Sequence, residues 1–430
     1  IREGPQVDTT KTPATIRFKD SYDGETPFRK GIKMAPRELQ QCREQLLELL
    51  HKGYIRPSAS PFGAPILMVP KPGDPSKLRM VVDYRAINAL TQSDRYPLPD
   101  INTMMQQLQG KKVFSTIELL WGFWQIPMLE EHKERTAMTT QQFGAFEWHC
   151  LPMGLKNSPS IFQRAMQEML RDLDFCHCYI DDVVVASETP EQHTKHLRIL
   201  FERLRNSKVL AKGSKANLFR TSCNFLGHVI SADGISPQQK KVEAVANWPT
   251  PCTVTDIRAF LGLAGYYRRF IPKFSALAAP LNALLKDNAE WIWDPDEQGI
   301  GFQKLKTALT TAPLLILPDM GAAMDGSAPF RVQTDASLAA MGGVLMQDQG
   351  RGFQPISFAS KTFLPAEMNY RATERELRAL IYCTCEVWRR ELWGCEYELQ
   401  GDHRPLVWLL DPQREISRRQ AQWLDTLGEN

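Results

Sequence analysis

Asp181 and Asp182 are the adjacent acidic residues of this sequence that best suit metal chemistry. Apolar and β-branched runs precede and follow them, which predicts a strand, a tight turn at the acid pair and a second strand. Adjacent carboxylates repel each other unless a cation neutralises them, and Mg²⁺ prefers oxygen ligands. Two such ions about 3.5–4 Å apart can clamp the attacking and leaving oxygens of a phosphoryl transfer. The alternative is an ordinary surface turn, which the flanking strands and the rest of the chain disfavour.

The elements before this hairpin alternate between helix and strand patterns. Apolar residues at helical spacing predict an amphipathic helix over residues 36–53, and a shorter helix is expected over 98–108. The run 113–119 predicts a strand that carries Glu118 near its end. Another strand is expected over 144–148. The acid pair therefore lies within a mixed α and β region.

A basic hairpin is predicted between residues 64 and 85. Strand patterns cover 64–69 and 77–85, and the prolines and glycine of 72–75 predict a turn between them. Lysine and arginine donate hydrogen bonds to phosphate oxygens and neutralise their charge, so such a hairpin suits a triphosphate. A solvated basic turn is an equally good interpretation of these residues alone. The basic residues are Lys71, Lys77, Arg79 and Arg85.

A loop over residues 151–159 is expected to lead into a helix over 160–170. Gly154 permits the close approach of a ligand to the backbone. Ser158 and Pro159 stand where an N-cap and a first-turn proline belong. The loop therefore predicts a contact surface held by a helix start.

Residues 225–285 combine a short strand, expected over 225–230, with a helical segment over 237–285. The helical segment is rich in lysine, arginine, tyrosine and phenylalanine. Basic residues among aromatic ones suit contacts to a nucleic-acid backbone and stacking on bases. A helix pair with aromatic residues in its core and solvated charges remains an open alternative.

A second domain is expected after a linker over residues 321–329. Three acids follow: Asp335 on a strand, Glu376 in the first turn of a helix over 373–388, and Asp402 at the end of another strand. Clustered carboxylates that bind Mg²⁺ also serve nucleases. Their spacing alone does not establish a second metal site.

Length and composition indicate an ordinary globular protein of two or three domains, with 430 residues, 43% hydrophobic residues and a net charge of +3. No apolar run approaches the roughly 20 residues of a membrane span. Nine cysteines without a Cys-x-x-Cys pair favour reduced thiols inside the cell rather than disulfides or zinc. A start at Ile1 suggests a product cut from a polyprotein or a trimmed chain.

The order of the motifs resembles the reverse transcriptases of gypsy-class LTR retrotransposons, followed by their RNase H domain, from about Pro36 to the end of the chain. The resemblance implies an α+β fold: a right-hand polymerase of fingers, palm and thumb, then an RNase H-like α/β domain. The motifs are SPFGAP at 60–65, RMVVDYR at 79–85, LPMGL at 151–155, YIDD at 179–182, FLGH at 225–228, FLGL at 260–263, YYRRF at 266–270 and QTDAS at 333–337.

The resemblance also implies domain limits and residue roles. An N-terminal arm is expected over 1–35, fingers and palm over 36–235, a thumb or connection-like region over 236–327, and an incomplete RNase H-like domain over 328–430. Catalytic and metal-binding roles fall on Glu118, Asp181, Asp182, Asp335, Glu376 and Asp402. Nucleotide contacts fall on Lys71, Arg79, Phe123 and Gly154, with Phe123 as the aromatic residue that rejects a 2′-hydroxyl. Primer and template contacts fall on Phe225, Leu226, Gly227, His228, Arg268 and Arg269.

The resemblance therefore predicts RNA- and DNA-directed DNA synthesis by a two-Mg²⁺ mechanism, with Mn²⁺ as a substitute and an associated RNase H endonuclease. Expected partners are RNA template, DNA primer, RNA–DNA hybrid, dNTPs, a second copy in a homodimer, and neighbouring protease and integrase segments, with no membrane. The expected location is the cytoplasm, in virus-like particles. An inert subunit or domesticated copy that only binds hybrid, and a nuclease-only enzyme, are the alternatives.

Three positions depart from the family pattern. Glu118 stands where the family has aspartate, which moves the carboxylate by one methylene, or about 1.5 Å. Gly401 precedes Asp402 where the family usually has threonine. The chain stops at Asn430, before the family's last RNase H carboxylate. These departures favour weakened polymerase and nuclease activities.

Overall fold

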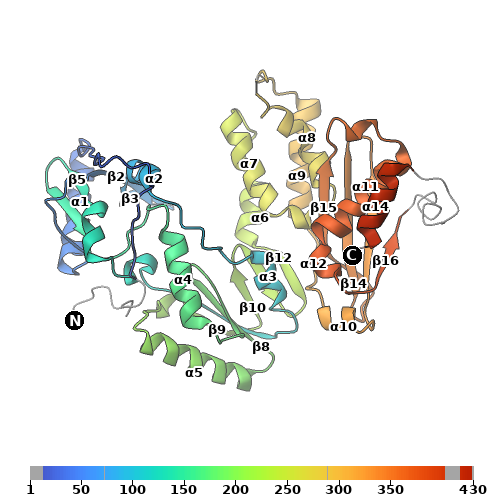
Figure 1. Ribbon diagram of the computed structural model, residues 1–430, viewed down its shortest axis with the longest axis horizontal. Coiled ribbons are helices and arrows are strands. Elements are labelled where there is room, and N and C mark those ends of the chain that lie inside the picture. Colours follow the sequence, from blue (N-terminus) through green and yellow to red (C-terminus); the bar gives the residue numbers. More distant parts are fainter. Residues whose placement is uncertain (1–12, 72, 288, 402–416, 429–430) are drawn as a thin grey trace. The chain divides into compact units, whose positions relative to one another are not determined.

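The structure is a computed structural model that describes residues 13–71, 73–287, 289–401 and 417–428 (Figure 1). Its contacts divide the chain into two compact units. The first unit comprises Ile1–Met104 and Lys111–Cys223, and the second comprises Met105–Gly110 and Asn224–Asn430. The sequence-based domain limits stay predictions, and the units are described separately below.

The fingers-like part of the first unit is a mixed sheet with the strand order β1-β6-β5-β2-β3. Helix α1 lies along β3 and covers its free edge: Gln41 Oε1 accepts from Leu78 N at 2.8 Å, and Gln45 Oε1 accepts from Met80 N at 3.0 Å. Such cover prevents pairing with other chains. The elements are α1 (Pro36–His51), β1 (Ile55–Pro57), β2 (Ala64–Lys71), β3 (Asp74–Val82), α2 (Arg85–Leu90), η2 (Glu130–Thr136), β5 (Met138–Thr140) and β6 (Gly144–Trp148).

The palm-like part is a sheet with the strand order β7-β8-β4-β9. Residues 183–186 of strand β8 are apolar and buried, and helix α5 packs on this strand while α4 packs on its neighbour β7. The apolar residues of β8 and of the helix faces therefore supply the core beneath the acid pair. The elements are β4 (Val113–Glu118), η1 (Gly122–Gln125), α4 (Ser158–Leu170), β7 (Cys176–Tyr179), β8 (Asp182–Ser187), α5 (Pro190–Asn206), η3 (Gly213–Lys215) and β9 (Asn217–Arg220). Helix α3 (Ile101–Gln106) precedes them, and its last two residues belong to the second unit.

The second unit begins with a small sheet, β10-β11-β12, and a group of helices. Helix α7 starts at a capping box in which Thr253 and Asp256 each accept the other's backbone N–H. The elements are β10 (Ser222–Phe225), β11 (His228–Ser231), β12 (Gly234–Pro237), α6 (Gln239–Ala246), α7 (Val254–Tyr266), η4 (Arg268–Phe270), α8 (Phe274–Ala283), η5 (Pro295–Gly299), α9 (Ile300–Thr310) and α10 (Met320–Met324).

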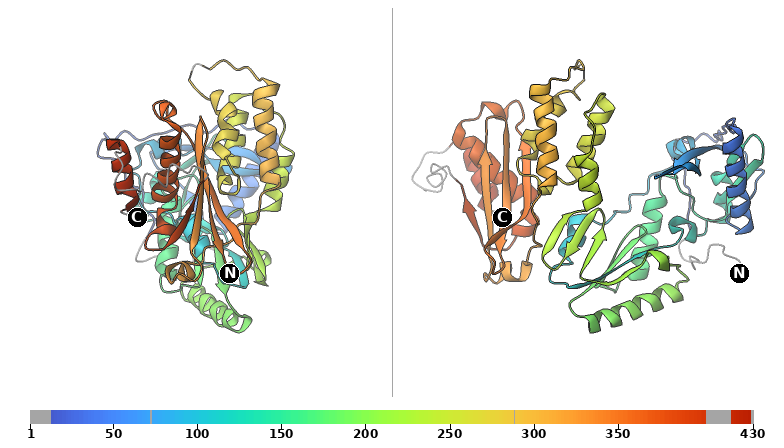
Figure 2. Two further views of the ribbon diagram at one scale, coloured as in Figure 1. Left: turned by 90° about the vertical axis from the view of Figure 1, so that its right-hand side faces the viewer. Right: turned by 180° about the vertical axis from the view of Figure 1, so that it is seen from behind.

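The rest of the second unit is an α/β layer structure around the sheet β15-β14-β13-β16, in which only the pair β13–β16 of the described strands is parallel. Figure 2 shows α11 and α14 on one face of this sheet and α8 on the other. The elements are β13 (Phe330–Ala336), β14 (Ala340–Asp348), β15 (Phe353–Thr362), η6 (Glu367–Asn369), α11 (Ala372–Ile381), η7 (Tyr382–Val387), α12 (Arg389–Leu392), β16 (Tyr397–Gln400) and α14 (Arg418–Gly428).

Most expected elements are confirmed, with local corrections. The strand expected over 77–85 ends at Val82, and α2 begins at Arg85. The expected linker 321–329 contains most of α10, which Asp319 caps by accepting from Ala322 N. The helix expected over 373–388 changes at Tyr382 into the π-helical turn η7. Across the described ranges, no helix is long and apolar enough to cross a membrane.

Candidate active sites

The acid pair lies at the tip of the β7–β8 hairpin, as the sequence predicts. Ile180 turns the chain with a φ of +56°, a left-handed conformation that β-branched residues rarely adopt. Antiparallel pairing of β4 with β8 places Glu118 directly opposite Asp182. Leu119 N donates to Asp181 O at 3.0 Å, which ties the turn to the end of β4. Three carboxylates therefore come from two adjacent backbone segments.

Gln163 of α4 holds this turn, and the sequence reasoning missed it. Its side chain is fully buried. Its Oε1 accepts from Ile180 N at 2.7 Å, and its Nε2 donates to Cys178 O at 2.9 Å. These bonds satisfy one backbone group of the turn and one of β7, the end strand of this sheet. A polar residue on the apolar face of a predicted amphipathic helix was the signal that could have revealed it.

The electrostatics of the acid group favour a cation. Burial raises the pKa of Asp182, and the neighbouring Asp181 and Glu118 raise it further. Lys215, at the end of η3, supplies one positive charge: its Nζ lies 2.7 Å from Glu118 Oε1 and 2.5 Å from Oε2. The donor set consists of hard carboxylate oxygens, which suit Mg²⁺. As placed, the described His, Cys, Asp and Glu residues form no group of three that could hold a metal ion.

Phe123 lies in the short helix η1, directly after the strand that carries Glu118. The ring packs edge-on against Phe162 of α4, with 5.5 Å between centroids. Gly122 brings this backbone close to the acid turn, since an added Cβ there would lie 3.8 Å from Asp181 Cβ. Phe123 therefore follows a backbone segment that lies close to the acid pair, and its contact with a nucleotide sugar stays a prediction.

Lys71 and Arg79 lie on the fingers-like hairpin. Both side chains are exposed. Arg79 pairs with Val69 across β2 and β3, and Lys71 pairs with Asp74 next to a register shift. The contacts of α1 to the residues on either side of Arg79 fix the backbone of this strand. The hairpin thus presents both cations to solvent.

Gly154 adopts a φ of +93°, and its carbonyl accepts from Asn88 Nδ2 at 2.9 Å. The expected helix over 160–170 needs a correction: α4 begins two residues earlier, at Ser158, and Asn157 rather than Ser158 takes the N-cap position. Ser158 Oγ instead donates to Pro152 O at 2.8 Å, because the residue lies inside the first turn and is buried. Asn88 and Ser158 therefore hold the loop by donating side-chain hydrogen bonds to its carbonyls, and Ser158 does not act as an N-cap.

The expected strand over 225–230 is also corrected. Phe225 ends β10, Leu226 and Gly227 form a turn with positive φ at both residues, and His228 begins β11. Phe225 and His228 are buried. Burial lowers the pKa of His228 to about 4, so this imidazole is neutral at physiological pH. The four residues therefore form a tight hairpin rather than a straight strand.

Arg268 and Arg269, expected to contact primer or template, donate to the RNase H-like sheet. Arg268 Nη2 lies 2.6 Å from Ser360 O, and Arg269 Nη2 lies 3.3 Å from Ile356 O. Both acceptors belong to β15. The two guanidinium groups therefore join η4 to this sheet, and their nucleic-acid role stays a prediction.

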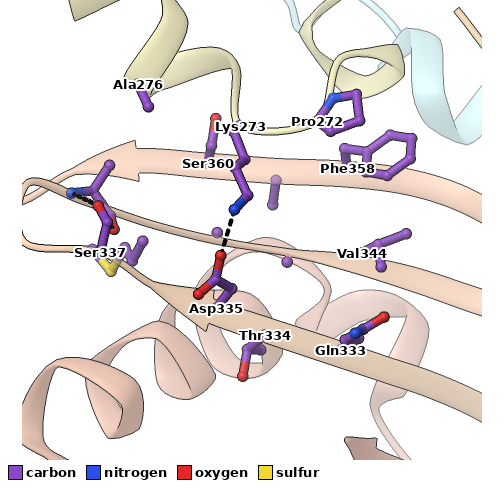
Figure 3. Close-up of a pocket in the computed structure, with 15 residues that line it drawn as sticks. Pro272, Lys273, Ala276, Gln333, Thr334, Asp335, Ser337, Val344, Phe358 and Ser360 are labelled. Atoms are coloured by element: carbon purple, nitrogen blue, oxygen red, sulfur yellow. Dashed lines mark hydrogen bonds and ion pairs between the residues drawn. The ribbon is translucent and has the colours of Figure 1, made fainter. Parts of the chain in front are cut away.

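In the RNase H-like part, the structure pairs Asp335 with a lysine. Lys273 Nζ lies 2.7 Å from Asp335 Oδ2, beside a cavity of about 460 Å³ between the start of α8 and the sheet (Figure 3). Figure 3 shows Asp335 and Thr334 pointing to opposite sides of β13. Glu376 is buried on α11, in its second turn rather than its first. Asp402 lies outside the described residues, so the predicted nuclease triad stays a prediction.

Two family models match this chain. A model described as "Reverse transcriptase (RNA-dependent DNA polymerase)" matches residues 69–230. A model described as "RNase H-like domain found in reverse transcriptase" matches residues 325–429. The first match includes both strands that carry the acid group, and the second includes Asp335 and Glu376.

Curated relatives align with nearly the whole chain. The Pol polyprotein from the Drosophila melanogaster transposon 297 is 37% identical over 94% of the chain, and that from its transposon gypsy is 32% identical over 98%. The alignments cover 37% and 41% of those polyproteins, so the chain spans about two fifths of their length. A foamy viral protease-reverse transcriptase in complex with dsDNA shares the fold, with a TM-score of 0.81, 24% identity, and coverage of 97% of this chain and 73% of that one.

Proposed function

Because the chain belongs to the reverse transcriptases of gypsy-class LTR retrotransposons that carry an RNase H-like domain, we propose that it is an RNA-directed DNA polymerase with an associated RNase H. It extends a DNA primer on an RNA or a DNA template, and it cleaves the RNA of the resulting hybrid. The single observation that carries the polymerase assignment is the β4–β8 register, which sets Glu118 against the Asp181–Asp182 turn.

In this proposal the three carboxylates bind Mg²⁺, with Mn²⁺ as a substitute. When bound, the ions would supply positive charge at the α-phosphate of a dNTP, where the primer 3′-oxygen forms a new P–O bond, the bond to the β-phosphate breaks and pyrophosphate leaves. Asp181 and Asp182 are fixed by the hairpin and by Gln163. Glu118 would join them as a ligand once its carboxylate is released from Lys215. The raised pKa of Asp182 supports a site that gains from a cation.

The dNTP is bound from the fingers side in this proposal. Lys71 and Arg79 donate to its triphosphate, which their exposure on the hairpin supports. Phe123 lies beside the sugar and excludes a 2′-hydroxyl. Gly154 allows the nucleotide to approach the backbone, since its φ of +93° suits only a residue without a side chain.

Primer extension on an RNA template, with Mg²⁺ and then with Mn²⁺, tests the polymerase assignment. The unaltered chain should extend the primer, and Asp181→Asn should abolish extension. Lys71→Met should raise the KM for dNTP, whereas Lys77→Met is the matched control because Lys77 Nζ already pairs with Asp74 at 3.5 Å. Absence of extension with either metal, in a folded chain that binds template–primer, would refute the assignment.

Hybrid cleavage tests the nuclease assignment separately. Asp335, Glu376 and Asp402 hold the metal in this proposal. Asp335→Asn should abolish release of labelled RNA fragments while primer extension continues, because the acid group of the palm is unchanged. Equal cleavage by Asp335→Asn and the unaltered chain would exclude Asp335 from the nuclease site.

The remaining partners follow from the Pol context of the relatives. We propose that protease and integrase segments flank this chain in its polyprotein, that it works as a homodimer, and that it resides in cytoplasmic virus-like particles. Sedimentation of the purified chain, and fractionation of cells that express the whole element, test the assembly and the location. A monomer at all concentrations, or activity outside particles, would contradict these proposals.

A further inference from the structure

The Leu226–Gly227 turn has an unusual backbone. Leu226 has a φ of +47° and Gly227 a φ of +75°, so both central residues of this two-residue hairpin are left-handed. Glycine adopts this conformation freely, but leucine does not, and the surrounding contacts must hold it. The turn joins β10 to β11 and contains residues expected to contact the primer.

Two consecutive tyrosines at the end of α7 hold the turn. Tyr267 Oη donates to Gly227 O at 2.7 Å, and Tyr266 Oη donates to Leu226 O at 2.6 Å. Gly227 O also accepts from Gln238 N at 3.0 Å. Both carbonyls of the turn are thus bonded from outside the hairpin.

Tyr267 is the more deeply placed of the two tyrosines. It is fully buried, whereas 43% of Tyr266 is exposed. Its ring lies edge-on to His228, with 5.4 Å between centroids. Burial raises the pKa of its hydroxyl to about 12, so the group remains a donor. A Cβ added to Gly227 would lie 3.0 Å from that oxygen, so the contact depends on glycine.

We propose that Tyr267 is a positioning residue for the primer strand, which acts by fixing the Leu226–Gly227 turn. The inference rests on the proposed polymerase function and on the primer contact that the family resemblance implies for that turn. Loss of the hydroxyl frees the turn to leave its left-handed conformation. The primer 3′-end is then aligned less often with the acid group, while the nucleotide site in the fingers is unaffected.

Single-nucleotide addition by Tyr267→Phe tests this role, because phenylalanine keeps the ring and removes only the donor. With saturating template–primer, kcat should fall about three- to tenfold, the range expected for one hydrogen bond. The KM for dNTP should stay unchanged. Gly227→Ala should reproduce the loss, because its methyl group pushes the same hydroxyl away.

Tyr382→Phe is the matched control. Its hydroxyl is buried and donates to a backbone carbonyl of the same unit, Ser360 O, at 3.3 Å. Both phenylalanine variants should lower the melting temperature by a similar small amount, but only Tyr267→Phe should lower kcat. Equal kcat values for the two variants would overturn the inference and leave the polymerase assignment intact.

A fluorescent base at the primer 3′-end distinguishes failure of the Tyr267 inference from failure of the polymerase assignment. If the unaltered chain extends no primer, the polymerase assignment fails, and 2-aminopurine at the bound primer end decides the inference. Brighter, more mobile fluorescence with Tyr267→Phe than with Tyr382→Phe supports the role of Tyr267. Identical fluorescence, or no binding of template–primer by the unaltered chain, overturns it.

Discussion

Replacement of Glu118 by aspartate should accelerate DNA synthesis by this chain. The structure places Glu118 opposite Asp182 and holds its carboxylate on Lys215. The family resemblance leads us to expect aspartate at this position. The shorter side chain withdraws the carboxylate by one methylene, about 1.5 Å. Its nearer oxygen, now 2.5 Å from Lys215 Nζ, would then lie about 4 Å away, at the limit of an ion pair.

The expected gain is large because magnesium tolerates little error in ligand position. Mg²⁺ demands near-ideal octahedral geometry. A misplacement of about 1 Å costs on the order of 10²-fold in rate, so Glu118→Asp should raise kcat with Mg²⁺ by a comparable factor. The lost ion pair costs little stability: its lysine is 51% and its glutamate 33% exposed, and such pairs contribute about 0–1 kcal/mol.

Single-turnover addition of one dNTP to a primer on RNA measures the effect directly. Glu118→Gln is the control, since it keeps the length of the side chain and removes its charge, and it should be inactive. Lys215→Met removes the ammonium group that pairs with Glu118 and leaves the glutamate in place. This variant should raise the affinity of the acid group for Mn²⁺, measured by electron paramagnetic resonance. Glu118→Asp at or below the rate of the unaltered chain would refute the geometric reasoning and identify glutamate as a fully competent ligand.

Three further variants test other contacts. Gln163→Leu removes two hydrogen bonds that hold the acid turn, so it should lower the free energy of unfolding in urea by about 1–3 kcal/mol and slow primer extension. An unchanged free energy of unfolding and an unchanged extension rate would show that Gln163 does not hold the turn. Asp182→Asn should raise the melting temperature of the EDTA-treated protein at pH 7, because burial and the neighbouring acids penalise ionised Asp182 in the folded state. This gain in melting temperature should vanish as the pH falls toward the ordinary aspartate pKa of 3.8, where the aspartate is protonated as well. A gain that does not depend on pH would contradict this reasoning. In an Asp181→Asn background, which weakens the other candidate metal site, Lys273→Met should strengthen Mn²⁺ binding at Asp335. The melting temperature should change little, since the Lys273–Asp335 ion pair is exposed. Unaltered Mn²⁺ binding would show that Lys273 does not compete with the ion for Asp335.

The palm was predictable from the sequence because its signals are local. The acid pair between apolar runs predicts the hairpin, and the run that ends at Glu118 predicts a strand. The pairing of these two segments follows from their order in the family rather than from residue spacing. The structure confirms the elements, and it adds the register that sets Glu118 against Asp182.

The contacts that fix the turns were not predictable, because each joins residues far apart in the sequence. Gln163 reaches the acid turn from α4, and Tyr267 reaches Gly227 from α7. Positive φ angles at Ile180 and Leu226 have no local signal, since both residues favour backbone conformations with negative φ. A left-handed apolar residue therefore identifies a place where tertiary contacts override local preference.

At both candidate metal sites, a lysine ammonium group contacts a carboxylate that is expected to bind a metal ion. Glu118 accepts a lysine from η3, and Asp335 accepts a lysine from the start of α8. In each case a carboxylate that the resemblance assigns to a metal meets an ammonium group from a nearby segment of the same unit. Burial and mutual repulsion make an acid cluster costly without a cation, as the raised pKa of Asp182 indicates. The lysine ammonium group relieves part of that cost from the end of a long, flexible side chain. It can therefore move away when a divalent ion binds, since the ion carries twice the charge and lies closer to the carboxylates. In the proposed function, metal affinity at each site would therefore be a difference between two cations, set by the lysines as well as by the carboxylates.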